Sequence, residues 1–323
     1  MNDENYSIGV TGASGFVGSY LVRTLMEQPR YSVVAYARKQ LAYPAASVDL
    51  QIVGDICGVS DWSVFFAGLS CVVHTAARVH VMEDNSTNPL KEFRRVNLDV
   101  TSRMARGAAI AGVKRFIFIS SIKVNGEETK PGVFFSPHDD PKPTDPYGIS
   151  KMEAEQALRV IARETGMEVV IIRPVLVYGA GVKANFLNLL KLSGRGWPLP
   201  LASIENNRSF VSVYNLVDLI ITCITHPNAA NQTFLVSDDC DLSTPQLLRR
   251  MAKSLNKKIL LLPLPSRLLE LATVLMGKGA VGQRLCRSLQ VDISKTKDLL
   301  NWNPIITVDE ALIETANYLK EKA

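Results

Sequence analysis

The sequence has few features that would place it in a specialised class of protein. Its five cysteines are odd in number and contain no C-x-x-C spacing: Cys57, Cys71, Cys223, Cys240 and Cys286. They predict neither a disulfide framework nor a zinc site, and they are typical of a reducing compartment. The first five residues are polar and acidic, unlike a signal peptide. We therefore expect a cytoplasmic protein that binds no metal.

Concentrated charge of one sign and long apolar runs are also missing. The 36 Lys and Arg residues exceed the 31 Asp and Glu residues by only five and are scattered along the chain, so nucleic acid is not an expected partner. No stretch approaches the roughly 20 apolar residues of an integral membrane segment. The nearest, Leu260 to Met276, is interrupted by prolines and charges. Peripheral membrane binding through it is a weak alternative, because little basic sequence accompanies it.

The remaining features are those of an ordinary globular protein. The chain has 323 residues, of which 47% are hydrophobic and 21% are charged, enough for one large or two modest domains. Apolar runs predict buried strands at 7–11, 31–37, 50–56, 71–77, 116–121 and 167–174. Helical stretches separate them, including 89–111 and the stretch after Pro146. This alternation predicts an α/β fold with a doubly wound parallel sheet.

A glycine motif follows the first predicted strand. The sequence Gly12-Ala13-Ser14-Gly15-Phe16-Val17-Gly18 has the spacing GxxGxxG and opens a predicted helix. Glycines permit a sharp turn and close approach of a diphosphate, which the helix N-terminus attracts. The alternative is a simple glycine-rich turn. We assign the following residues of this motif to a dinucleotide cofactor: Gly12, Ser14, Gly15, Phe16, Val17 and Gly18.

A second motif carries candidate catalytic residues. Pro146 suits the first position of a helix, and Asp145 before it suits the cap. Tyr147 and Lys151 are four residues apart and should share a helix face, where the ammonium is expected to lower the pKa of the phenol. The alternative is a surface Tyr and Lys. The strand 116–121 ends in two serines, at the end of a parallel strand where ligands bind.

Together these motifs resemble the extended short-chain dehydrogenase/reductase family, of the NAD-dependent epimerase/dehydratase type, over almost the whole chain. The resemblance implies a Rossmann domain over residues 1–175, to which the chain returns at about 211–237. A smaller C-terminal substrate lobe is expected over 176–210 and 238–323. A homodimer through the helices near 89–111 and 147–165 is also implied.

The resemblance assigns Ser121, Tyr147 and Lys151 to catalysis. Ser121 is preferred to Ser120 because it lies three residues before Val124, as in the family's Ser/Thr-x-x-Val-Tyr-Gly; here Asn125 replaces the Tyr. The family also implies cofactor contacts beyond the glycine motif. They fall on Asp55, Ile56, Ala76, Ala77, Tyr147, Lys151 and on Pro174 of the segment Arg173-Pro174-Val175-Leu176-Val177-Tyr178-Gly179.

The end of the second predicted strand bears on which cofactor is used. An Asp or Glu there would bind the ribose hydroxyl of NAD(H). The sequence Ala35-Tyr36-Ala37-Arg38-Lys39 contains no acid, and Arg38 could pair with a 2′-phosphate. A solvated basic loop is the alternative. We therefore favour NADP(H) over NAD(H).

Four residues are candidates for substrate binding. The resemblance places Asn185 and Arg208 near a substrate diphosphate, and Arg287 in the family's closing segment. Lys123 lies two residues beyond Ser121 and could hold the sugar as a point charge or hydrogen-bond donor. A solvated loop lysine is an equal alternative for Lys123. The expected substrate is a UDP-sugar.

The residues after Ser121 indicate which nucleotide-sugar reactions are expected. Sugar 4,6-dehydratases have a sequence similar to Thr-Asp-Glu at this point, whose carboxylates serve the elimination of water. This chain has Ser121-Ile122-Lys123 instead, so dehydration is not expected. The longer motifs resemble a bacterial subgroup of UDP-glucose 4-epimerases and of 4-reductases that make UDP-N-acetylquinovosamine. With the NADP(H) preference, we predict reduction of a UDP-4-keto-6-deoxy-N-acetylhexosamine for O-antigen synthesis. A UDP-glucose or UDP-N-acetylglucosamine 4-epimerase is the alternative. A non-catalytic dinucleotide-binding sensor is another, less favoured because Tyr147 and Lys151 are both present.

Overall fold

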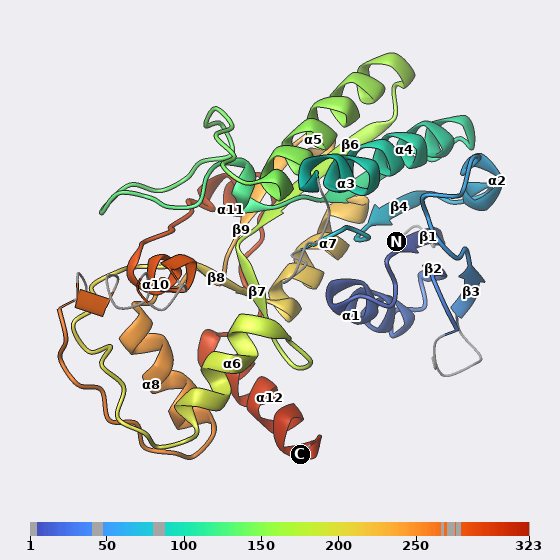
Figure 1. The fold of residues 1–323 in the computed structure, drawn as a ribbon. Helices are drawn as coiled ribbons and strands as arrows, with labels where there is room; N and C mark the ends of the chain where they lie inside the picture. The colour runs from blue at the N-terminus through green and yellow to red at the C-terminus, as the bar shows by residue number, and fades with distance from the viewer. Residues whose placement is uncertain are drawn as a thin grey trace.

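The protein is built on a seven-stranded sheet (Figure 1). The computed structural model describes residues 5–40, 48–79, 88–265, 268–269, 275 and 279–322. All strand pairs are parallel, in the order β3-β2-β1-β4-β5-β6-β9. The strands are β1 (Tyr6–Thr11), β2 (Tyr31–Ala37), β3 (Val48–Ile52), β4 (Cys71–His74), β5 (Arg115–Ile119), β6 (Glu168–Pro174) and β9 (Thr233–Val236). The order reverses between β1 and β4, which confirms the predicted doubly wound sheet.

Helices cover both faces of this sheet. One face carries α1 (Phe16–Met26), α7 (Val213–Thr225) and α11 (Ser294–Leu300), and the other carries α2 (Ser63–Phe66), α3 (Pro89–Arg94), α4 (Thr101–Ile110) and α5 (Pro146–Thr165). Leu21 and Ile220 lie in one buried cluster, whereas Met104 and Leu158 lie in the other. Full burial of such a side chain contributes about 1.5–3 kcal/mol, so the two clusters hold the helices to the sheet.

The predicted helix at 89–111 is interrupted by a wider turn. Between α3 and α4 lies a π-helical segment, η1 (Arg95–Val100), which contains the buried Asn97. The Asn97 Nδ2 donates to Ser150 Oγ at 3.0 Å and to the Arg78 carbonyl at 3.1 Å, and its Oδ1 accepts from the Arg78 N–H. This turn therefore joins the α3–α4 segment to α5 and to the loop after β4.

Three strands end earlier than predicted. β3 ends at Ile52, β4 at His74 and β5 at Ile119. For β3 the cause is local, because Gly54 has a φ of +63°, a left-handed conformation that a strand does not contain. The predicted site residues at the ends of these strands consequently lie in the loops beyond them.

The C-terminal part forms its own buried cluster. It contains the short parallel pair β7 (Leu176–Tyr178) and β8 (Phe210–Ser212), with α6 (Ala184–Ser193), α8 (Thr244–Ser254), α10 (Gly279–Cys286) and α12 (Val308–Glu321). These helices gather beside the sheet in Figure 1. Phe186, Leu248 and Leu312 are buried together there. Short 3₁₀ turns lie at η2 (Ile122–Val124) and η3 (Pro227–Ala229). The predicted domain boundary at residue 175 stays a prediction.

A substitution at Gly18 tests how tightly the turn between β1 and α1 is packed. A Cβ at this position would lie 2.2 Å from the Gly12 carbonyl oxygen and 2.8 Å from Thr75 Oγ1. Gly18→Ala should therefore lower the free energy of unfolding by roughly 1–3 kcal/mol in urea titrations, although alanine favours helix. Gly58→Ala is the matched control, because its Cβ would meet only the Asp55 carbonyl at 3.4 Å. Equal stability of the two variants would contradict this packing.

Candidate active site

A cavity of about 800 Å³ lies beyond the carboxyl ends of the central strands. The cavity is lined by every residue predicted from the sequence to bind the cofactor: Gly12, Ser14, Gly15, Phe16, Val17, Gly18, Arg38, Asp55, Ile56, Ala76, Ala77, Tyr147, Lys151 and Pro174. These residues come from loops far apart in the sequence. The parallel sheet brings them together because all of its strands end on this side.

The glycine turn makes one wall of the cavity. Gly12 has a φ of +74°, and a Cβ there would lie 2.6 Å from the Ala76 nitrogen. Gly15 caps α1, no side chain caps the helix, and its first turn contains no acidic residue. The N–H groups and the positive end of the helix dipole are thus available to an anion. This wall fits the diphosphate of a dinucleotide cofactor.

Arginines and one carboxylate line the wall formed by the loops after β2 and β3. Hydrogen bonding by the Cys57 backbone lowers the pKa of Asp55, and the charges of Arg95 and Arg38 lower it further. Arg95, on the π-helical turn, and Arg78 also line the cavity. Neither arginine was predicted from the sequence, because an isolated arginine in a helix or loop carries no local signal. These side chains place positive charge at this end of the cavity.

Tyr147 and Ser121 meet at the start of α5. As predicted, Asp145 caps this helix, its carboxylate accepting from the Gly148 N–H at 2.6 Å, and Pro146 follows the cap. The Ser121 side chain interacts with the Tyr147 phenol and lowers its pKa. The neighbouring Ser120 is engaged elsewhere, because its hydroxyl donates to Glu155. Ser120 lines the cavity and Ser121 does not, so the choice of Ser121 over Ser120 stays a prediction.

Lys151 lies one turn after Tyr147 and is buried. Its ammonium donates to the Ile119 carbonyl at 2.8 Å and lies 4.3 Å from the centre of the Phe118 ring. Burial lowers the pKa of Lys151 to about 7, whereas the charge of Glu155 raises it. At neutral pH Lys151 is therefore close to its own titration point.

The pKa of the Tyr147 phenol differs from the prediction. Burial raises its pKa to about 12, the interaction with Ser121 lowers it, and the charge of Asp145 raises it. The prediction that Lys151 lowers the pKa of Tyr147 below its usual value is wrong for this state of the protein. The cost of burying a phenolate exceeds the effects that favour it. A neutral phenol is a proton donor, which suits transfer of a proton to a carbonyl oxygen.

Two other polar residues near the active-site strands, His74 and Asn125, have structural contacts. His74 is buried, with Nδ1 2.6 Å from Thr11 Oγ1 and Nε2 3.0 Å from Thr101 Oγ1. Burial, followed by the charge of Lys151, lowers its pKa to about 3, so the imidazole is neutral. Asn125 is also buried and donates to the Ser136 carbonyl at 2.7 Å. His80 lies outside the described residues.

The four predicted substrate residues do not line the cavity. Lys123 forms ion pairs with Glu127 and Asp145, so its ammonium is held beside the helix cap. Arg208 donates to the Arg287 carbonyl at 2.9 Å, which brings these two residues together. Asn185 is exposed in the first turn of α6. Their contacts with a substrate stay predictions.

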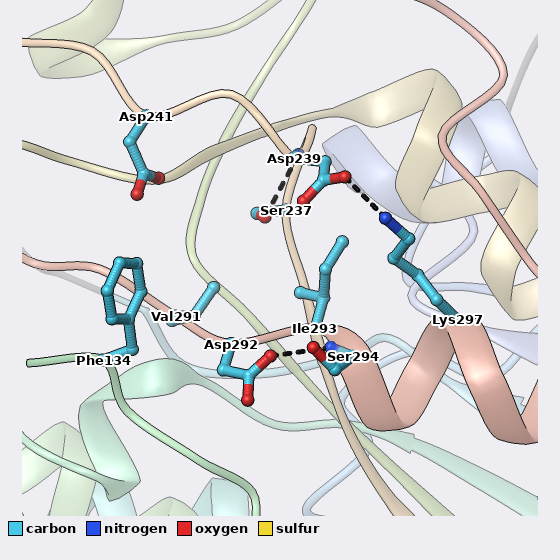
Figure 2. Close-up of a pocket in the computed structure, with 9 residues that line it drawn as sticks. All are labelled: Phe134, Ser237, Asp239, Asp241, Val291, Asp292, Ile293, Ser294 and Lys297. Atoms are coloured by element: carbon cyan, nitrogen blue, oxygen red, sulfur yellow. Dashed lines mark hydrogen bonds and ion pairs between the residues drawn. The ribbon is translucent and has the colours of Figure 1, made fainter.

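A second pocket, of about 420 Å³, does not have the chemistry of an active site (Figure 2). It is lined by Phe134, Ser237, Asp239, Asp241, Val291, Asp292, Ile293, Ser294 and Lys297. Asp239 pairs with Lys297 at 2.8 Å, Asp292 accepts from the Ser294 N–H, and Asp241 accepts from Gln290. Each of the three carboxylates is thus bonded within the protein, and no predicted site residue is among them. The larger cavity is the candidate active site.

Two general properties follow from the described part of the chain. No group of three or more His, Cys, Asp or Glu residues within it could hold a metal ion. None of its helices is both long and apolar enough to cross a membrane.

Comparisons with known proteins agree with the fold. The model of the NAD dependent epimerase/dehydratase family matches residues 8–237. UDP-glucose 4-epimerase from Vibrio cholerae is 48% identical over 96% of this chain and 94% of its own. The N-acetyl-alpha-D-glucosaminyl-diphospho-ditrans,octacis-undecaprenol 4-epimerase of Escherichia coli O157:H7 is 30% identical over 82% of this chain and 76% of its own.

A solved structure shows the same fold at lower sequence identity. UDP-glucuronic acid 4-epimerase from Bacillus cereus, in complex with NAD, superposes with a TM-score of 0.78 at 21% identity, over 98% of this chain and 99% of that one. The family match spans most of the chain, and the Vibrio cholerae relative matches nearly all of it. The chain therefore belongs to the NAD-dependent epimerase/dehydratase family and is an NAD(P)-dependent enzyme of the extended short-chain dehydrogenase/reductase type.

Proposed function

We propose that this enzyme acts at C4 of a UDP-hexose as a 4-epimerase. The observation that carries the proposal is the convergence of Ser121, Tyr147 and Lys151 beside a cavity that fits a dinucleotide. The two relatives named as 4-epimerases, at 48% and 30% identity, support C4 as the reacting carbon. The chain also lacks the acidic pair after Ser121 that dehydration would require.

Each of the three residues has a distinct task in this proposal. A bound nicotinamide cofactor supplies the hydride chemistry. Tyr147 exchanges a proton with the oxygen on C4, and Ser121 hydrogen-bonds to the same oxygen. Lys151 holds the cofactor ribose and favours the phenolate when the proton leaves Tyr147. We further propose that Lys123, Asn185, Arg208 and Arg287 hold the sugar and the diphosphate of the substrate.

A second candidate is the 4-reductase, which converts a UDP-4-keto-6-deoxy-N-acetylhexosamine into the corresponding alcohol. Two observations favour it. Arg38 lines the cavity where an NAD(H)-specific protein would have an acid, and net reduction consumes NADPH. The raised pKa of Tyr147 suits proton donation to a ketone. A cytoplasmic homodimer through α3, α4 and α5 is expected for either candidate.

Proton NMR of the reaction products distinguishes the two candidates. The protein is incubated with UDP-glucose, UDP-N-acetylglucosamine or the 4-keto-6-deoxy sugar nucleotide, each with and without NADPH. A 4-epimerase gives an equilibrium of C4 epimers without consuming NADPH. A 4-reductase converts only the keto sugar and consumes one NADPH per product. The proposed function fails if no sugar nucleotide changes at C4 under any of these conditions.

The role of Tyr147 can be tested by removing only its hydroxyl. Tyr147→Phe should lower kcat by about 10²–10⁴-fold, because the proton carrier is lost, while the affinity for the cofactor is retained. Cofactor affinity is read by nucleotide fluorescence and kcat by the NMR assay. Tyr318→Phe, at an exposed tyrosine of α12, should leave both unchanged. Normal turnover by Tyr147→Phe would show that another group carries the proton.

The cofactor preference depends on Arg38. We propose tighter binding of NADP(H) than of NAD(H), because the guanidinium can pair with the 2′-phosphate. Arg38→Ala should weaken NADPH binding by about 10–100-fold, as expected for a lost charged hydrogen bond, and leave NADH binding unchanged. Lys39→Ala removes an adjacent exposed cation that does not line the cavity, and should have little effect. Equal affinities for both cofactors in the starting protein would refute the preference.

A further inference from the structure

One face of α5 carries a third polar residue in line with the catalytic pair. Tyr147, Lys151 and Glu155 are spaced by four residues and lie on the same side of the helix. Each one contacts the end of β5. Ser121 interacts with the Tyr147 phenol and lowers its pKa, the Ile119 carbonyl accepts from Lys151 at 2.8 Å, and Ser120 donates to Glu155 at 2.6 Å.

Glu155 is held rigidly from its far side. The residue is fully buried, and the equally inaccessible Arg173 of β6 binds both carboxylate oxygens, at 2.8 Å through Nε and 2.6 Å through Nη2. The third nitrogen of Arg173 donates to Asn125 Oδ1 at 2.9 Å. Arg159, one turn later on α5, adds a contact at 3.0 Å. A bidentate pair of this kind fixes both position and orientation.

We propose that Glu155 is a positioning residue of the active site, which holds Ser120 so that Ser121 faces Tyr147 and places a fixed negative charge one turn from the Lys151 ammonium. The inference rests on the proposed roles of Tyr147 and Lys151. Without the Ser120 bond, the backbone that carries Ser121 would keep only the Lys151–Ile119 bond as a polar anchor to this face of α5. Without the charge, Lys151 would lose its nearest compensating anion.

The electrostatics of Lys151 agree with this role. Burial lowers the pKa of Lys151 and Glu155 raises it, so loss of the carboxylate charge lowers the pKa further. The other titratable groups that face Lys151 are the neutral His74 of β4 and Tyr147 on its own helix. Neither supplies a negative charge at neutral pH. The ammonium form, which donates to Ile119, therefore depends on Glu155.

The test is Glu155→Gln in the full-length enzyme with its cofactor. The amide keeps the shape of the side chain and removes the charge. We expect kcat at neutral pH to fall about 10-fold, and the alkaline limb of the kcat/KM profile to move down by about one pH unit. Glu155→Asp keeps the charge on a shorter side chain and should restore the alkaline limb, even where kcat stays low. Glu153→Gln is the matched control, because this half-buried acid of the same helix pairs with Arg94 of α3 and has no bond to Ser120 or Arg173.

One further measurement and one further variant distinguish the possible outcomes. The pH dependence of NADPH binding, read by fluorescence, needs no sugar and should shift in the same direction, so it separates failure of the inference from failure of the proposed substrate. If Glu155→Gln does not fold, the neutral pair Glu155→Gln with Arg173→Gln replaces it and should shift the alkaline limb in the same direction by a smaller amount, because a cation is lost together with the carboxylate. Superimposable pH profiles for Glu155→Gln and the starting protein, with lowered thermal stability alone, would overturn the proposal.

Discussion

The buried ion pair between Glu155 and Arg173 is the interaction on which the catalytic geometry depends. Removing two charges from water is costly, and such a pair is tolerated only where other polar groups satisfy its remaining atoms. Ser120 and Asn125 do so here. Loss of one partner would leave an uncompensated buried charge at a cost of about 3–5 kcal/mol. The pair therefore holds β5, β6 and α5 in one arrangement, in which Ser121 and Lys151 are also placed.

The cofactor end of the cavity depends on a different constraint, the reversal of strand order between β1 and β4. This reversal leaves a crevice at the carboxyl edge of the sheet. Gly12 and Gly18 allow the β1–α1 turn to pass close to the loop after β4, because a Cβ at either position would collide with Ala76 or Thr75 of that loop. One end of the site thus needs close backbone packing without side chains, whereas the other needs buried charges with full sets of partners.

The sequence could predict the features that neighbouring residues determine. The sheet, the glycine turn and the Asp145 cap all follow from local spacing, and the structure contains each of them. The pKa of Tyr147 could not be predicted, because it depends on burial by distant segments. The same holds for Arg173, which meets Glu155 only after β6 has joined the sheet. Only the four-residue spacing from Lys151 to Glu155 could have drawn attention to the latter.

The titration properties of the site bear on the choice between epimerase and reductase. A reductase needs the Tyr147 phenol only as a proton donor, which its raised pKa favours. An epimerase must take a proton from the C4 hydroxyl and later return it, so the phenolate has to be accessible as well. An ammonium close to a phenol favours the phenolate, and Lys151, which is proposed to play this part, has a pKa of about 7. The charge of Glu155 therefore matters more to an epimerase, because it keeps Lys151 protonated in the half-reaction that requires the phenolate.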